Sequence, residues 1–230
     1  MQIKHVVSFS GGKDSTAMLL MMIERDMQID DIVFCDTGLE FPQMYDHINA
    51  VEKNIGRKIT VIKSDKPYEY FLAEHVLIKG KRKGSIGYGY PSMRIRWCTA
   101  RLKVDVLKRY LKKYEKEGFS IKHYIGIASD EQKRCKEHIY PLVDWGITEA
   151  QALQYCYDKG FRWGGLYDDF RRVSCYCCPL QPLSELKTLW KKYPDLWQKM
   201  KKFDKRTHSS FRLDYTLDEI EQRFVCEGAK

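Results

Sequence analysis

The sequence contains no long hydrophobic run. Its longest apolar stretch, Thr16 to Ile23, is far shorter than the roughly 20 residues that a membrane-spanning helix needs, so we expect no span. The first residues also lack the basic start, apolar middle and small-residue cleavage site of a secretory signal. Internal repeats and low-complexity tracts are absent as well. With 43% hydrophobic and 31% charged residues, the chain has the composition of a globular protein, which we expect to be cytoplasmic and unattached to membranes.

Acidic residues are in the minority. The chain has 40 lysines and arginines against 31 aspartates and glutamates, which gives a formal net charge of +9. A positive balance raises the local concentration of ligands that carry phosphate and makes nucleic acid a candidate partner. The same balance often does nothing more than keep a protein in solution.

Short apolar runs alternate with helical patterns through the first part of the chain. We predict strands over residues 3–9, 31–35, 59–62 and 123–127, and helices over 14–25, 41–55, 99–116 and 149–159. This order predicts an α/β fold with a doubly wound, mostly parallel sheet flanked by helices. Residues 79–90 are expected to form a mobile basic loop. Further on we expect helices over 184–202, kinked or split by Pro194, and over 217–226, so we predict a nucleotide-binding domain over 1–180 and a helical extension packed on it over 181–230.

The first strand runs into a loop that does not fit the two commonest phosphate-binding patterns. It lacks the four residues that separate the glycine from Gly-Lys in a Walker loop, and it lacks the Gly-x-Gly-x-x-Gly fingerprint. Backbone N–H groups, the positive end of a helix dipole, a lysine and hydroxyls nevertheless meet at this point, which predicts a phosphate site. Its candidate residues are Ser8, Ser10, Gly11, Gly12, Lys13, Asp14, Ser15 and Thr16. A tight strand-to-helix turn with an incidental lysine is the structural alternative.

The segment Ser10 to Ser15 is similar to the pyrophosphatase loop of ATP-cleaving synthetases, thiouridylases and phosphoadenosine phosphosulfate (PAPS) reductases, which share the adenine nucleotide α-hydrolase fold. Phe34 to Pro42, with Asp36, Thr37 and Gly38, resembles the Phe-x-Asp-Thr-Gly-x-x-Phe-Pro segment of the PAPS reductase branch. In that family the segment lies beside the nucleotide. The stretch from Gly126 to Glu131 is similar to the family's Gly-x-Arg-x-x-Glu segment, but Ala128 stands where arginine is usual. Tyr167 belongs to a Leu-Tyr pair that also resembles the family, although a core aromatic is the simpler interpretation.

The cysteines are concentrated in a way that indicates a metal site. Cys175, Cys177 and Cys178 lie within four residues, and Cys98 is brought to them only by folding. In iron-sulfur adenylyl-sulfate (APS) reductases, an upstream Cys-Cys pair and a downstream Cys-x-x-Cys hold a [4Fe-4S] cluster. Here Trp97 stands in place of one cysteine of the upstream pair. Either Cys177 is the fourth ligand, or one iron is left open to a substrate or sulfide, an arrangement that resembles the three-cysteine clusters of tRNA thiolases. A zinc site with the same sulfur ligands is the alternative.

One departure from the family separates its activities. PAPS reductases carry a Glu-Cys-Gly-x-His segment whose cysteine attacks the sulfonate, whereas here Cys226 precedes Glu227 and no histidine follows. This difference and the missing arginine at position 128 favour ATP over a sulfonucleotide. The resemblance then implies that Lys13, Asp14 and Asp36 act in catalysis, that Asp14 and Asp36 hold the loop or Mg²⁺, and that Gly126 contacts the nucleotide.

The leading interpretation is therefore an enzyme that uses ATP to adenylate an acceptor and then introduces sulfur with a cysteine-bound cluster. A tRNA or DNA acceptor fits the basic segments, among them Arg94, Arg96, Arg101 and Lys103. The first alternative is a PAPS or APS reductase with a thioredoxin-like donor. The second is a non-catalytic nucleotide- or nucleic-acid-binding module with structural zinc. A homo-oligomer is compatible with each of them.

Overall fold

The computed structural model describes residues 2–228. Two compact units can be distinguished, and the chain passes between them several times. The first unit comprises Met1–Asp36, Glu40–Lys63 and Val104–Ser174, and the second comprises Thr37–Leu39, Ser64–Lys103 and Cys175–Lys230. The expected division into a nucleotide-binding domain over residues 1–180 and a helical extension over 181–230 stays a prediction.

The first unit is built on a four-stranded parallel sheet with the order β3-β2-β1-β4. Its strands are β1 (Ile3–Ser8), β2 (Asp31–Asp36), β3 (Thr60–Lys63) and β4 (Ser120–Ile125). Val7 in β1 pairs with Ile32 on one side and with Tyr124 on the other. The two central strands are rich in valine and isoleucine because both faces of a parallel sheet are covered by helices. The α/β fold with a parallel sheet is confirmed.

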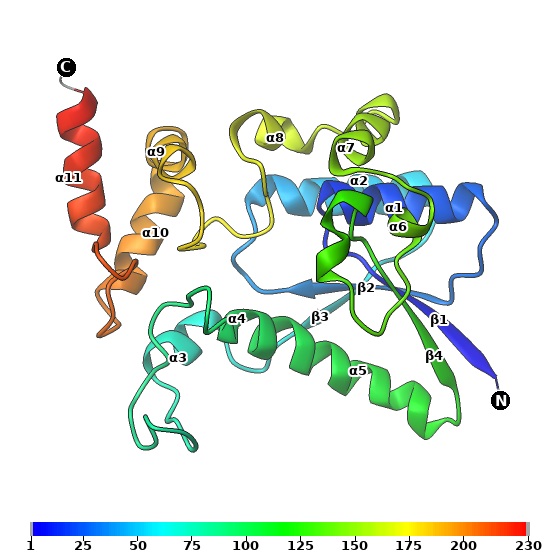
Figure 1. Cartoon of the computed structure of the whole chain (residues 1–230), viewed down its shortest axis with the longest axis horizontal. Coiled ribbons are helices and arrows are strands. Elements are labelled where there is room, and N and C mark those ends of the chain that lie inside the picture. Colours follow the sequence, from blue (N-terminus) through cyan, green and yellow to red (C-terminus); the bar gives the residue numbers. More distant parts are fainter. Residues whose placement is uncertain (1, 229–230) are drawn as a thin grey trace. The chain divides into compact units, whose positions relative to one another are not determined.

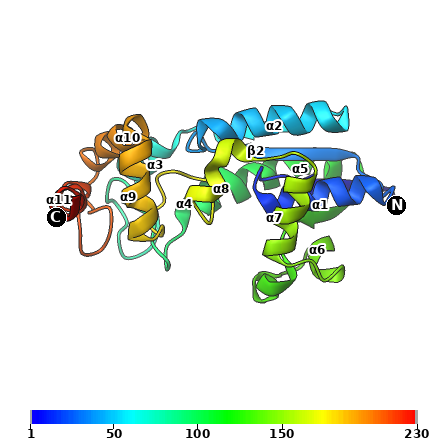
Figure 2. The same ribbon diagram turned by 90° about the horizontal axis from the view of Figure 1, so that it is seen from above.

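Helices cover both faces of this sheet (Figures 1 and 2). On one side lie α1 (Lys13–Glu24) and α2 (Pro42–Ile55), with α7 (Glu149–Asp158) and the short α6 (Pro141–Asp144) packed against α1. On the other side α5 (Asp105–Lys116) contacts β3 and β4. Every residue of α1 from Ser15 to Met22 is buried, which is the environment that its run of methionine and leucine predicts.

Other parts of the first unit are short helices that the sequence pattern did not reveal. They are the 3₁₀ helices η2 (Ser129–Arg134) and η3 (Trp163–Gly165) and the single turn α8 (Leu166–Asp169). The helix expected over residues 99–116 is interrupted, because a π-helical turn η1 (Ala100–Val104) separates α4 (Trp97–Thr99) from α5.

The strand order of the sheet reverses at β1, between β2 and β4. From β1 the chain moves outward through β2 and β3, and it then crosses to the opposite side of β1 to form β4. Open α/β sheets bind ligands where the order reverses in this way, outside the carboxyl ends of the strands. Residues 9–12 follow β1 and Gly126 follows β4. The fold thus places the predicted phosphate loop at the switch point of the sheet.

The second unit is helical. It contains α3 (Tyr68–Ala73), α4, α9 (Leu183–Lys192), α10 (Pro194–Asp204) and α11 (Leu217–Gly228). Pro194 is the first residue of α10, so the split expected at this proline is confirmed. Trp197 and Phe224 are among the largest fully buried side chains and join α10 to α11. Within residues 2–228, no helix has both the length and the apolar character needed to cross a membrane.

Candidate functional site

The loop between β1 and α1 turns sharply and is tied down on both sides. Gly11 has φ +77°, and a Cβ atom on it would lie 2.8 Å from Cε of Met44, so no other residue fits without movement. The indole N–H of Trp163 donates to the carbonyl oxygen of Gly11 over 2.7 Å. Trp163 itself has φ +48°, a backbone conformation that costs energy for a residue with a side chain. A strained segment from η3 therefore holds the turn.

Two serines of the loop hold each other. The Oγ of Ser15 lies 2.9 Å from the Oγ of Ser10 and accepts the backbone N–H of Ser10 over 3.1 Å. Its own proton is donated to the carbonyl oxygen of Gly12 over 3.0 Å. These bonds fix the path of the loop, so the hydroxyl of Ser15 acts on the shape of the site as well as on any ligand.

Backbone donors at the start of α1 are only partly satisfied. The N–H of Lys13 donates to the hydroxyl of Tyr167 over 2.7 Å, and the N–H of Thr16 donates to Gly12 over 3.0 Å. No described residue accepts the N–H of Asp14 or Ser15. Unsatisfied N–H groups at a helix start, together with the helix dipole, form an anion site.

Gly126 touches this helix start from the neighbouring strand. A Cβ atom on Gly126 would lie 2.7 Å from both the nitrogen and the Cα of Ser15. Glycine is therefore needed for α1 to begin this close to the end of β4. The structure thus brings Gly126 to the loop, and its contact with a nucleotide stays a prediction.

Lys13 lies within a group of carboxylates. Its side chain is 9% exposed, and its ammonium nitrogen is 3.3 Å from Oδ2 of Asp14 and 3.1 Å from Oε1 of Glu149. Burial raises the pKa of Asp14 to about 6, although Lys13 acts in the opposite direction. The other oxygen of Asp14, Oδ1, is buried and has no hydrogen-bond partner. Burial thus makes the ionised carboxylate of Asp14 energetically costly, and the positive charge of Lys13 offsets part of this cost.

Asp14, Glu131 and Glu149 can bring oxygen atoms within 4.8 Å of one another. Carboxylate oxygens suit Mg²⁺, which usually keeps several waters and binds through one or two carboxylates and the phosphates of its substrate. The sequence predicts Asp14 as a residue that holds the loop or Mg²⁺, but it assigns no role to Glu131 or Glu149. Glu131 stands in the segment that resembles the family, but Glu149 shows no signal beyond its position at a helix start.

Two predicted residues, Ser8 and Thr16, contact histidine side chains. The Oγ of Ser8 lies 2.6 Å from Nε2 of His123, and the Oγ1 of Thr16, which is fully buried, lies 2.9 Å from Nε2 of His47. Burial lowers the pKa of His47 to about 3, so this ring is neutral.

Asp36, the last residue of β2, accepts from Tyr45 over 2.9 Å and pairs with Lys63 at 2.7 Å. Thr37 and Gly38, which follow it, belong to the second unit and form a tight turn, with the N–H of Leu39 donating to Oγ1 of Thr37 over 3.3 Å and with φ +74° at Gly38.

Tyr167 is the clearest site residue that the sequence did not assign. The sequence favours a role for Tyr167 as a core aromatic. In the structure its hydroxyl accepts a hydrogen bond from the N–H of Lys13, and its ring packs edge-on against Trp163. Burial raises the pKa of Tyr167, so its hydroxyl stays protonated while it accepts the N–H of Lys13. Below the loop, the thiol of Cys156 donates to the carbonyl oxygen of Lys13 over 3.5 Å.

All four predicted metal ligands, Cys98, Cys175, Cys177 and Cys178, belong to the second unit. Tyr68 lies among them. Burial, followed by the nearby thiols of Cys177, Cys98 and Cys175, raises the pKa of Tyr68 well above its usual value. Its side chain is 2% exposed, and its hydroxyl has no hydrogen-bond partner. A buried O–H donor that interacts electrostatically with three thiols fits a site in which a sulfide or thiolate bound there accepts its proton.

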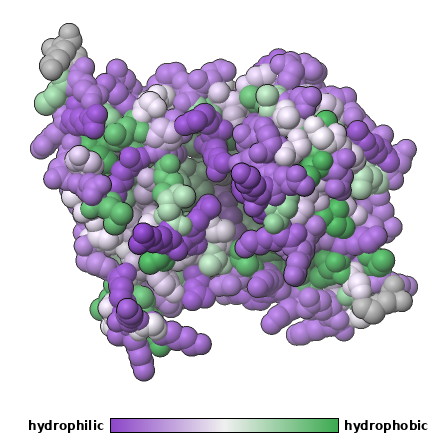
Figure 3. Space-filling model, viewed as in Figure 1, coloured by the Kyte–Doolittle hydropathy of each residue, from purple (hydrophilic) through white to green (hydrophobic). Residues whose placement is uncertain are grey.

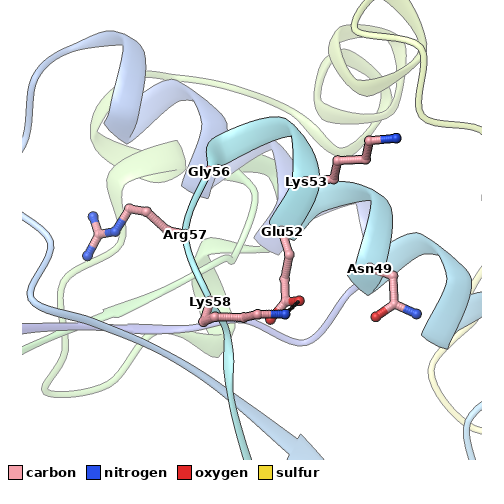
Figure 4. Close-up of a pocket in the computed structure, with 6 residues that line it drawn as sticks. All are labelled: Asn49, Glu52, Lys53, Gly56, Arg57 and Lys58. Atoms are coloured by element: carbon pink, nitrogen blue, oxygen red, sulfur yellow. Dashed lines mark hydrogen bonds and ion pairs between the residues drawn. The ribbon is translucent and has the colours of Figure 1, made fainter.

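A shallow hollow of about 370 Å³ lies elsewhere, at the end of α2 (Figure 4). Gly56 ends that helix, and the lining residues Lys53, Arg57 and Lys58 are basic. Glu52 inside it is already bound to Lys58 and to the N–H of Ile59. The hollow is at the amino end of β3, away from the carboxyl ends of the strands, and it is not part of the phosphate site.

Residues 4–181 match the phosphoadenosine phosphosulfate reductase domain. The chain belongs to the PAPS reductase family. PAPS reductase from Candida auris, solved as a phosphate complex, has a similar fold, with a TM-score of 0.52 and 19% identity over 75% of this chain and 81% of that one.

Curated relatives of this PAPS reductase family chain include an uncharacterized protein of Methanocaldococcus jannaschii, 30% identical over 94% of this chain and 50% of its own length. Another is an uncharacterized nin region protein of Escherichia phage lambda, 33% identical over 57% of this chain and 50% of its own length. The chain spans about half the length of these curated relatives. Membership of the PAPS reductase family supports nucleotide binding and sulfur chemistry.

Proposed function

We propose that this chain uses ATP, with Mg²⁺, to activate an acceptor for the introduction of sulfur. One observation carries the proposal. The start of α1 offers unsatisfied N–H groups beside Lys13, and the carboxylate of Asp14 there lies within reach of Glu131 and Glu149. Hydrogen-bond donors for phosphate therefore lie next to carboxylate oxygens that could bind a cation. A polyphosphate with a bound metal ion requires both.

In the activation step, a carbon-bound oxygen of the acceptor attacks the α-phosphorus of ATP. The new P–O bond forms as the bond to the β-phosphate oxygen breaks, and pyrophosphate leaves with the electron pair. The N–H groups of Asp14 and Ser15 and the ammonium of Lys13 stabilise the negative charge that accumulates on the phosphate oxygens. Mg²⁺ held by Asp14 would neutralise the leaving pyrophosphate.

In the second step, a sulfide-level donor from outside the chain attacks the activated carbon. A C–S bond forms, the C–O bond breaks and AMP departs, so no net oxidation or reduction occurs. Cys98, Cys175, Cys177 and Cys178 are the residues that would hold an iron-sulfur cluster, which supplies sulfur binding or electron transfer when bound. The hydroxyl of Tyr68 would donate to sulfur there. Nucleic acid is the acceptor class that the basic segments favour.

Reduction of PAPS or APS to sulfite is the second candidate, and the family and the similar fold of a PAPS reductase favour it. Two features argue against reduction. Cys226, which is exposed on α11, does not lie in the Glu-Cys-Gly-x-His segment of PAPS reductases, and the buried Ala128 stands where that family usually has arginine. A thioredoxin-like protein would then supply the electrons.

One experiment separates the candidates. Anaerobically purified protein is incubated with ATP and with PAPS, in the presence and absence of nucleic acid. Formation of AMP and pyrophosphate from ATP that depends on nucleic acid supports the proposal, whereas sulfite from PAPS supports reduction. Iron and zinc are measured on the same sample, with Cys175→Ala as the variant and Cys226→Ala as the control. Colourless protein that contains zinc and turns over neither nucleotide would support a binding module.

A further inference from the structure

Nearly all of the net positive charge of the protein comes from one stretch of the chain. Of the 40 lysines and arginines, eight lie within residues 75–103, and this stretch contains no aspartate or glutamate. The remainder of the chain holds 32 basic and 31 acidic residues and is nearly neutral. The whole stretch belongs to the second unit. The net charge of +9 is therefore a local property and not a general feature of the surface.

Part of this stretch forms a hairpin, residues 76–86, which we call the basic hairpin. Val76 bridges Ile86 in antiparallel fashion, and the N–H groups of Leu77 and Gly84 bond across the hairpin over 2.9 and 2.8 Å. At its base, the N–H groups of Gly87, Tyr88 and Gly89 bond to carbonyl oxygens of α3 and the residues around it. Figure 1 shows this segment projecting beside α3.

Arginine braces the hairpin, while lysines form its tip. Arg82 donates to the carbonyl oxygens of Tyr88 and Gly87 over 3.1 and 3.2 Å and lies 2.9 Å from Nε2 of His208. Lys79, Lys81 and Lys83 are exposed, and no described carboxylate pairs with them. The same holds for Arg94 and Arg96, which precede Cys98. Exposed cations without carboxylate partners are available to an external polyanion.

Apolar side chains accompany these cations on the surface. Ile78 is 69% exposed and Ile86 is 60% exposed. In Figure 3 hydrophobic and hydrophilic residues lie side by side over this hairpin, at the lower left of the view. Membrane-binding segments use tryptophan, phenylalanine and leucine for insertion and gather their cations on one face. The cations here are spread along the stretch as far as Lys103, which suits an extended polyanion better.

We propose that the basic hairpin, together with Arg94 and Arg96, binds the phosphates of a nucleic acid. This inference rests on the proposed function only in naming the acceptor class, since binding can be measured without nucleotide. The lysines bind phosphates without regard to sequence, and Ile78 and Ile86 contact sugars or bases. Cys98 lies two residues after Arg96, so the stretch that holds the strand also carries a predicted cluster ligand.

The test is binding of labelled DNA and RNA oligonucleotides, single-stranded and duplex, measured by fluorescence anisotropy over a range of salt. Lys79→Gln, Lys81→Gln and Lys83→Gln are combined in one variant, and Arg82 is kept because it braces the hairpin. The matched control combines Lys199→Gln, Lys202→Gln and Lys205→Gln, exposed lysines of the same unit. Both variants lose the same charge, and thermal unfolding checks that both fold.

We expect the hairpin variant to lose affinity on the order of 100-fold at about 0.1 M salt and its salt slope to fall by about 2 to 3, since each phosphate contact contributes about 0.7 to 0.9. The control should change little. Equal losses in the two variants, or no loss in either, would overturn the proposal. Binding of wild-type protein to vesicles of anionic lipid but to no oligonucleotide would overturn it in favour of a membrane surface. An intact oligonucleotide affinity in a protein that does not bind ATP would refute the proposed function alone.

Discussion

Replacing Asp14 by asparagine should stabilise the protein at neutral pH while abolishing its use of Mg²⁺ and ATP. The carboxylate of Asp14 is 20% exposed, and burial raises its pKa from 3.8 to about 6. The folded state therefore binds more protons than the unfolded state between these two values, so stability falls as the pH rises through this window. Above about pH 6 the ionised carboxylate destabilises the fold by its full amount.

The size of the effect follows from the shift. Roughly two pKa units at 1.36 kcal/mol each correspond to about 3 kcal/mol, which the asparagine variant recovers above about pH 7 and does not recover below about pH 4. For a chain of this size, about 3 kcal/mol raises the melting temperature by about 6 to 12 °C. The amide oxygen of asparagine still accepts from Lys13, so the loop geometry is kept.

Urea unfolding of Asp14→Asn and wild-type protein over a series of pH values, with a chelator to remove divalent cations, measures this difference. Asp46→Asn, which removes a carboxylate from an exposed position of α2, is the control and should not gain stability at about pH 7.5. An Asp14→Asn protein that is no more stable than wild type at about pH 7.5, or whose advantage persists below about pH 4, would refute the reasoning.

Other predictions concern single contacts of the two sites. In Tyr167→Phe the N–H of Lys13 loses its hydroxyl acceptor and becomes free to bind phosphate. ATP should therefore bind roughly 2- to 10-fold more tightly by calorimetry. Weaker binding would mean that the hydroxyl of Tyr167 contacts the ligand instead. Gly126→Ala places a Cβ atom against the backbone of Ser15, which should cost about 1 to 3 kcal/mol in urea unfolding and weaken ATP binding; an unchanged midpoint would contradict the close approach. Tyr68→Phe should leave the stability of the metal-free protein unchanged or higher, because the hydroxyl has no partner, and should lower the reduction potential of the iron-loaded protein through loss of a hydrogen bond to sulfur. A potential equal to that of wild type would show that Tyr68 does not donate to the cluster.

Much of the fold could be predicted from short stretches of sequence. The strand that ends at Ser8, the glycine turn and the buried helix from Lys13 are each apparent from neighbouring residues, because turn chemistry and hydrophobic periodicity act over a few positions. Pro194 likewise separates α9 from α10 for a local reason, since proline cannot occupy a helix interior without breaking it.

The site depends on contacts that no local pattern contains. Tyr167 and Trp163 reach the loop from more than 150 positions along the chain, and Glu149 reaches Lys13 from 136 positions away. Only the folded chain shows that the hydroxyl of Tyr68 lies among cysteines. Sequence pattern predicted the loop and the cysteines as sites, whereas the side chains that surround them are apparent only in the structure.

The central claim is that the loop from Ser10 to Thr16 binds the phosphates of ATP, and calorimetric titration with ATP and Mg²⁺ tests it most directly. Wild-type protein should show one site. Lys13→Ala should weaken binding at least tenfold, because a buried ammonium beside the phosphates contributes on the order of 1.5 to 3 kcal/mol. Lys53→Ala, at an exposed position of α2, should bind as wild type does. An affinity in Lys13→Ala equal to that of wild type would contradict the claim.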